Sequence, residues 1–155
     1  MSDLLKQASN FLTPRMWHKG RYSEIRLDDN RPKFCVLGAV GAAAYWGSPA
    51  GVPTFGDDED AEGCIADFFD EHKQEDGDQT AMAELHALSE AIHEREWCKI
   101  TTHPRARCNH GDHPEEWVEH LIVCIASFND DQYTSLEQVQ QIVTRAQEII
   151  DEQAP

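Results

Sequence analysis

The residues best able to do chemistry gather between Trp97 and His113, a stretch rich in histidine, cysteine and arginine. Thiolate and imidazole are the ligands that zinc prefers, and an irregular segment of this length needs something to organise it. We therefore predict a structural zinc, with His103 as a substitute for any member of the ligand set Cys98, Cys108, His110 and His113. The spacing is not that of a standard zinc finger, because Cys98 has no Cys-x-x-Cys partner. The alternative is a polar surface loop.

Cys35 is a second candidate, because we expect it in the first turn of a helix, where the helix dipole favours a nucleophilic thiolate. With a histidine and Asn129 or Asp130 it could form a Cys-His-Asn arrangement for covalent catalysis. The sequence singles out none of its eight histidines for this role. The alternative is that Cys35 is a small buried hydrophobic residue between Phe34 and Val36.

The segment Phe128-Asn129-Asp130-Asp131 is a third candidate, since Asn129 and Asp130 could bind a ligand. Asparagine and aspartate side chains also hydrogen-bond to nearby backbone groups and so fix the chain between two helices. We expect this local structural role here.

Charge is the most unusual bulk property of the chain, which has 13 Lys and Arg against 29 Asp and Glu, a net charge of −16. Residues 57–96 hold fifteen acidic residues against only Lys73 and Arg95. Such a field repels nucleic-acid phosphates and attracts a basic protein. We predict that this region presents an acidic surface to a partner, through Asp57, Asp58, Glu59, Asp60, Asp67, Asp70 and Glu71.

The charge favours a non-enzymatic binding protein whose partner is a basic host protein, and DNA mimicry by helix carboxylates is one version of this hypothesis. A rival hypothesis is a small zinc-stabilised or cysteine-dependent enzyme or ligand-binding domain that uses Cys35 or the 98–113 loop. The same composition also suits an acidic surface without a specific partner, or a structural subunit of a larger assembly. We expect no direct contact with nucleic acid.

Three observations place the protein in the cytoplasm. No stretch approaches the ~18 apolar residues of a membrane span, so we expect no contact with a membrane. The first residues lack the basic-then-apolar pattern of a signal peptide. The five cysteines are an odd number in a chain of 155 residues, which favours reduced thiols or metal ligands over a disulfide framework.

The elements that must position these residues are mainly helical. Apolar residues recur at helical spacing in 4–12, 34–46, 61–72 and 79–95, and two further helices begin at Pro114 and after a Thr134–Glu137 capping box. Glycines and alanines in 34–46 would let another segment approach this helix closely. Alternation followed by a strong turn predicts a small β-hairpin near 21–33. We predict an all-α fold of about six helices around one core, in a single domain over 1–155.

Three fragments together resemble an uncharacterised family of short proteins from actinobacteria and their phages. They are Trp17 followed by Gly20, the run 34–40 (Phe-Cys-Val-Leu-Gly-Ala-Val), and the run 125–130 (Ile-Ala-Ser-Phe-Asn-Asp). Members show a Cys-Leu-Leu-Gly-Ala helix start and a Trp-Asn-Asp before the last helix; here valine replaces the first leucine and phenylalanine the tryptophan. The resemblance covers roughly 4–46 and 121–146 and leaves 47–120 as an elaboration outside it. It implies a phage or actinobacterial source and a helical fold, but no activity.

Overall fold

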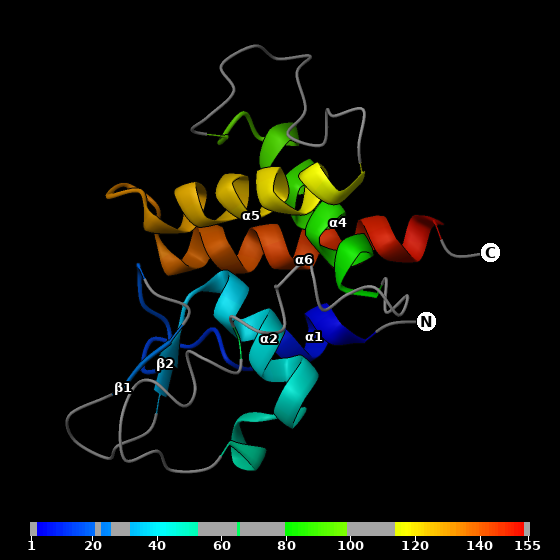
Figure 1. Ribbon diagram of the computed structural model, residues 1–155. Helices are drawn as coiled ribbons and strands as arrows, with labels where there is room; N and C mark the ends of the chain where they lie inside the picture. The colour runs from blue at the N-terminus through cyan, green and yellow to red at the C-terminus, as the bar shows by residue number, and fades with distance from the viewer. Residues whose placement is uncertain are drawn as a thin grey trace.

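The computed structural model describes residues 3–20, 23–25, 32–52, 65, 80–98 and 114–153 (Figure 1). Within them the chain is mainly helical with one short pair of strands, which confirms the predicted fold class. The elements in chain order are α1 Leu4–Ser9, β1 Ser23–Ile25, β2 Pro32–Phe34, α2 Val36–Trp46, a 3-10 turn Pro49–Gly51, α4 Thr80–Glu94, α5 Pro114–Asp130 and α6 Leu136–Gln153.

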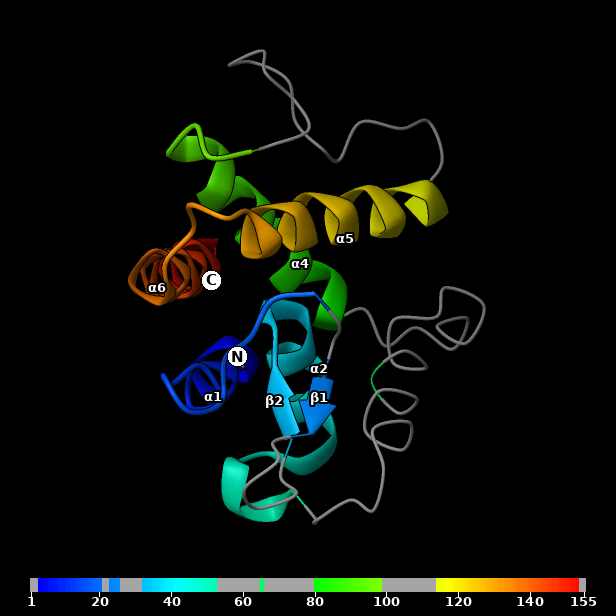
Figure 2. The same cartoon turned by 90° about the vertical axis from the view of Figure 1, so that its left-hand side faces the viewer.

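Helix α4 packs against both α5 and α6. Helix α1 packs against α2 and α6, and α2 also contacts α5. Figures 1 and 2 show α1, α2 and the strand pair lying together below α4, α5 and α6. These packed faces share one hydrophobic core, whose large buried side chains include Leu5, Phe11, Leu37, Leu88, Leu121 and Ile125.

Helix α2 is buried over its first eight residues, 36–43. Its small residues permit the close approach that the sequence predicted: a Cβ atom added at Gly41 would lie 2.8 Å from Cγ2 of Ile65. Ile65 is itself fully buried. Close packing of this kind offsets the intrinsic cost of glycine within a helix.

The predicted hairpin near 21–33 is confirmed as an antiparallel pair in which Ser23 lies opposite Phe34 and Ile25 opposite Pro32. The segment before it extends the arrangement, because Phe34 N donates to Met16 O at 2.6 Å and His18 N donates to Phe34 O at 3.0 Å. The backbone around residue 17 therefore runs beside β2. This pairing brings the end of that segment next to the start of α2.

Helix α4 ends in a turn that reverses the chain. Glu96 N donates to His93 O and Trp97 N donates to Ile92 O, at 3.0 and 3.1 Å, which is the bond pattern of a Schellman motif. The reversing residue is Glu96, with φ of 59°, a conformation in which glycine is the usual residue. The turn redirects the chain back along the helix end, and Cys98 follows it.

The start of α6 differs by one residue from the predicted capping box. Ser135, rather than Thr134, is the N-cap, because its Oγ accepts from Gln138 N at 3.2 Å and Gln138 Oε1 accepts from Ser135 N at 2.9 Å. The reciprocal pair satisfies two backbone donors at the helix start. The prediction failed because Thr134 and Ser135 are both good caps, and each has an acidic or amide residue three positions later.

The remaining helix boundaries agree with the sequence in part. Helix α5 begins at Pro114 as predicted, whereas α1 ends at Ser9, before the predicted limit at residue 12. The predicted helix over 61–72 lies outside the described residues except for Ile65. No helix in the described part of the chain is both long and apolar enough to span a bilayer.

Candidate functional site

Asn129, at the end of α5, joins three distant parts of the chain through its side chain. Its Oδ1 accepts a hydrogen bond from Trp17 Nε1 at 2.8 Å and a second from Val36 N at 3.2 Å. Its Nδ2 donates to His18 O at 3.2 Å and to Asp130 Oδ1 at 3.0 Å. The two N–H donors that face Oδ1 fix the orientation of the amide. Asn129 is 1% exposed and its bond to Val36 N is buried, whereas the other three bonds are partly buried.

Asn129 was predicted to bond to nearby backbone groups, and the structure corrects this prediction, since three of its four partners lie 93 or more residues away. The neighbouring aspartates extend the junction. Asp130 Oδ1 accepts from Gly20 N at 2.7 Å, and Lys19 Nζ donates to Asp131 O at 2.6 Å. Local bonding of the predicted kind occurs at Asp131, whose Oδ1 accepts from Tyr133 N. The junction therefore anchors the 17–20 segment to α5.

Cys35 occupies the N-cap of α2, one position before the predicted first turn. Its Sγ accepts a hydrogen bond from Gly38 N at 3.3 Å, and the residue is 3% exposed. Asn129 has both amide hydrogens and both oxygen lone pairs engaged, so it has no capacity left to orient an imidazole. The geometry therefore favours a capping role for Cys35 over a Cys-His-Asn arrangement that includes Asn129.

A second constellation joins the end of α4 to the middle of α5. One ligand atom each from His93, Cys98 and Cys124 all lie within 4.8 Å of one another, and such a group could hold a metal ion. Cys124 Sγ is 3.9 Å from His93 Nε2 and 3.9 Å from Cys98 Sγ. Cys124 is fully buried and His93 is 8% exposed, whereas Cys98 is partly exposed.

These distances are close to those of a tetrahedral zinc site. Bonds of about 2.3 Å to sulfur and about 2.0–2.1 Å to nitrogen place two sulfur ligands about 3.8 Å apart, and a sulfur and a nitrogen about 3.6 Å apart. The Cys98–Cys124 separation already matches the first value, and the His93–Cys124 separation exceeds the second by a few tenths of an ångström. Two of the three donor pairs thus have nearly the spacing of a zinc site, and the third pair, His93 and Cys98, lies within 4.8 Å.

The backbone and packing around this group explain its position. The turn at Glu96 returns the chain so that Cys98 lies near His93, one turn back on α4. Directly before Cys98, the Trp97 ring stacks on Phe128 of α5, with centroids 5.8 Å apart and an interplanar angle of 5°. Ser89 Oγ donates to Cys124 Sγ at 3.4 Å. The metal-capable group thus lies within a packed α4–α5 contact.

Of the predicted zinc ligands, the structure places Cys98 in this group, whereas Cys108, His110 and His113 lie outside the described residues. Sequence reasoning missed His93 and Cys124. A signal existed, because Cys124 continues the apolar stripe of α5 with Leu121, Ile125 and Phe128, and His93 follows Ile92 on the buried side of α4. The pairing itself was hidden, since these two residues are 31 positions apart.

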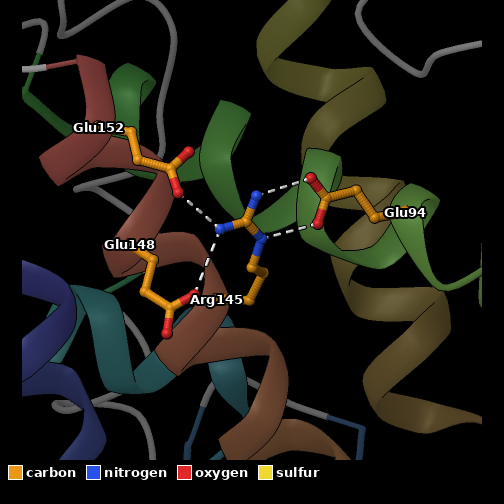
Figure 3. Close-up of polar contacts among 4 residues, drawn as sticks. All are labelled: Glu94, Arg145, Glu148 and Glu152. Carbon is orange, nitrogen blue, oxygen red and sulfur yellow. Dashed lines mark hydrogen bonds and ion pairs between the residues drawn. The ribbon is translucent and has the colours of Figure 1, made fainter.

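An ion cluster centred on Arg145 of α6 includes Glu94, from the described part of the acidic region 57–96 (Figure 3). Glu94 of α4 binds the guanidinium through both oxygens, at 2.8 and 3.1 Å. Glu148 and Glu152, one and two turns along α6, accept from Nη1 at 3.2 and 3.1 Å. The hydrogen bonds that Arg145 donates to Glu94, then to Glu152 and Glu148, raise the pKa of Arg145 above its usual range. Three carboxylates around one cation leave the cluster net negative.

The seven acidic residues proposed from the sequence as a partner-binding surface lie outside the described residues. Within the described part of 57–96 the carboxylates are not uniformly exposed. Glu84 is buried at 1% exposure, whereas Glu90, Glu94 and Glu96 are exposed. Of these three exposed residues, Glu94 is the one that forms an ion pair with Arg145.

Comparison with known proteins assigns the family. The profile of the family of unknown function DUF6197 matches residues 1–149. The chain therefore belongs to this family, which agrees with the resemblance to an uncharacterised family noted from the sequence. A comparison with curated proteins found no match, and neither did a comparison with solved structures.

Proposed function

We propose that this member of the DUF6197 family is a zinc-stabilised, non-enzymatic binding protein. The observation that carries the proposal is the convergence of His93, Cys98 and Cys124 at the α4–α5 contact. Two thiolates and an imidazole are soft and borderline ligands, a set typical of zinc rather than of magnesium or calcium. The bound ion would tie the end of α4 to α5.

Structural zinc sites have four protein ligands, so this proposal requires one more. The sequence supplies candidates in Cys108, His110 and His113, which were predicted together with Cys98. They are the last three Cys and His residues before α5. With one of these as the fourth ligand, the zinc would have no open position for a substrate, as a structural role requires. Because the ligands must lose their protons, zinc affinity would fall as the pH is lowered.

The metal content of the purified full-length chain tests this proposal. We expect stoichiometric zinc in the wild type and its loss in His93→Gln, Cys98→Ser and Cys124→Ser. Cys35→Ser is the matched control, because serine can cap α2 and Cys35 lies outside the group. Substoichiometric metal in the wild type, or full zinc retention in Cys124→Ser, would contradict the proposal.

A thermal unfolding measurement gives an independent readout of the same site. Ligand bound only to the folded state adds about 4 kcal/mol of stability when its concentration is about a thousand times Kd. We therefore expect a zinc chelator to lower Tm of the wild type and of Cys35→Ser. The same chelator should leave Tm of Cys98→Ser unchanged.

The partner in this proposal is a basic host protein that binds the acidic region 57–96, with DNA mimicry as one form of the interaction. Supporting observations are the net charge of −16 and the fifteen acidic residues against two basic ones in 57–96. The proposal includes no direct contact with nucleic acid and no contact with a membrane. Cys35, Cys98 and Cys124 are free cysteines, which supports a location in the reducing cytoplasm.

Capture of partners from a host lysate at low and high salt tests the binding proposal. We expect the captured protein to be basic and to dissociate as salt rises, because exposed charges are screened. Reversing the charge at Asp67, Asp70 and Glu71 should abolish capture. Binding that is indifferent to both salt and charge reversal would rule the interaction out. An actinobacterial or phage source, which the three sequence fragments support, would identify the lysate to use.

A further inference from the structure

Cys98 and Cys124 differ in exposure although their sulfur atoms are neighbours. Their Sγ atoms lie 3.9 Å apart, and a disulfide bond requires about 2.0 Å, so a relative movement of about 2 Å would join them. Cys98 is partly exposed and sits on non-helical chain directly after the Glu96 turn, whereas Cys124 is fully buried on α5. A dissolved oxidant can therefore reach the Cys98 thiol, whereas the Cys124 thiol is buried next to it.

The pair has the layout of an attacking thiol and a resolving thiol. Movement of the two sulfurs is easier on the Cys98 side, because that residue lies outside any helix. Cys35, the other described cysteine, is absent from the group and is engaged at the N-cap of α2. The difference in exposure thus favours Cys98 as the thiol that reacts with the oxidant and Cys124 as the thiol that then forms the disulfide.

We propose that Cys98 and Cys124 form a peroxide-responsive dithiol. In the first step the Cys98 sulfur attacks one oxygen of hydrogen peroxide, the O–O bond breaks, and a sulfenic acid and water form. In the second step the Cys124 sulfur attacks the Cys98 sulfur, the S–O bond breaks, and a disulfide and a second water form. The two thiols lose two electrons and two protons in total, and the peroxide is reduced to two waters.

The oxidation also affects the metal, and this part of the inference rests on the proposed zinc site. A disulfide sulfur is no longer a thiolate, so formation of the Cys98–Cys124 bond removes two of the three described zinc ligands. Zinc would be released as the disulfide forms. The end of α4 stays tied to α5 in both states, by the ion when reduced and by the covalent bond when oxidised.

Treatment of the full-length protein with hydrogen peroxide, in zinc-loaded and zinc-free form, tests this inference. After the remaining thiols are alkylated, we expect mass spectrometry to identify a peptide pair that links Cys98 to Cys124. A colorimetric chelator should detect zinc released in proportion to the disulfide. In Cys124→Ser we expect Cys98 to stop at the sulfenic acid, which a 1,3-diketone probe traps. Cys35→Ser should behave as the wild type.

The outcomes separate this inference from the proposed function. Stoichiometric zinc with no Cys98–Cys124 disulfide at any peroxide dose would overturn the dithiol and leave the zinc site intact. The disulfide in a protein that never binds zinc would support the dithiol and overturn the zinc site. Peroxide that links Cys98 to a cysteine other than Cys124 would also refute the inference. The wild-type peptide map needs no substitution, so it decides the question even if Cys124→Ser does not fold.

Discussion

Trp17 and Asn129 are 112 residues apart in sequence, yet the indole Nε1 donates to the amide Oδ1 at 2.8 Å. Asn129 also binds the backbone at the start of α2, through Val36 N. The three sequence fragments of the family resemblance therefore meet at a single side chain. Their shared role in this chain is to join the 17–20 segment, α2 and α5.

Replacing this amide should destabilise the protein. Asn129→Ala leaves the buried Val36 N and the partly buried Trp17 Nε1 without their acceptor, and an unsatisfied buried group costs about 1–3 kcal/mol. We expect the free energy of unfolding to fall by about 2–4 kcal/mol in urea denaturation. Asn10→Ala, at an exposed asparagine, is the control and should change it by less than about 0.5 kcal/mol. Equal effects of the two changes would contradict the role assigned to Asn129.

The turn at Glu96 carries backbone strain that glycine would relieve. A non-glycine residue with φ of 59° is disfavoured by about 1–2 kcal/mol, partly offset by the greater freedom of glycine in the unfolded chain. We expect Glu96→Gly to raise the free energy of unfolding by about 0.5–1 kcal/mol.

Glu90→Gly provides the control for this change, because Glu90 is an exposed residue within α4. Glycine there should lower the free energy of unfolding by about 1 kcal/mol. The two substitutions thus have opposite predicted signs in the same assay. Destabilisation by both would mean that Glu96 does not hold the left-handed conformation in solution.

Gly41 and Ile65 should be energetically coupled. Gly41→Ala places a methyl group 2.8 Å from Ile65 Cγ2, and overpacking of a buried site costs about 1–3 kcal/mol, against about 1 kcal/mol gained in helix propensity. We expect a net loss of about 1 kcal/mol in stability. In the Ile65→Ala background the clash disappears, so the same change should become stabilising. An additive double-mutant cycle would show that the two residues are not in contact.

His86 predicts part of the pH dependence of stability. Burial lowers its pKa below the usual 6.5, and the charge of Glu90 opposes this shift. As the pH falls through about 6.5, the unfolded state takes up the proton first, so stability should drop between this pH and the lower folded-state pKa. We expect the urea midpoint of the wild type to decrease over this range, less so in His86→Gln. Glu90→Gln should enlarge the decrease, because it removes the charge that raises the His86 pKa. Identical pH profiles for the wild type and His86→Gln would show that His86 does not contribute.

Local signals predicted most of the fold. Pro114 at the first helical position marked the start of α5 correctly, and alternation followed by a turn located the strand pair. The errors were local as well: Thr134 and Ser135 offered two adjacent caps, and the geometry of Gln138 decided between them. The position of an N-cap depends on side-chain geometry at one or two residues. The spacing of apolar residues gives no information about that geometry.

The candidate site could be predicted only in part, because its members meet through tertiary packing. Cys98 was identified from its chemical type, but its described neighbours His93 and Cys124 come from two helices that the sequence does not pair. Asn129 was expected to bond locally, since asparagine commonly does so. Its long-range partners follow from the packing of α2 and the 17–20 segment against the end of α5. The sequence carries no local signal for that arrangement.

X-ray absorption spectroscopy at the zinc edge of the purified full-length protein would identify the atoms bound to the proposed zinc. We predict one zinc with two or three sulfur ligands at about 2.3 Å and at least one nitrogen ligand at about 2.0–2.1 Å. The Cys98→Ser/Cys124→Ser double variant should lose the zinc, and its spectrum should show no zinc–sulfur shell. A wild-type shell of oxygen and nitrogen alone would contradict the proposed site.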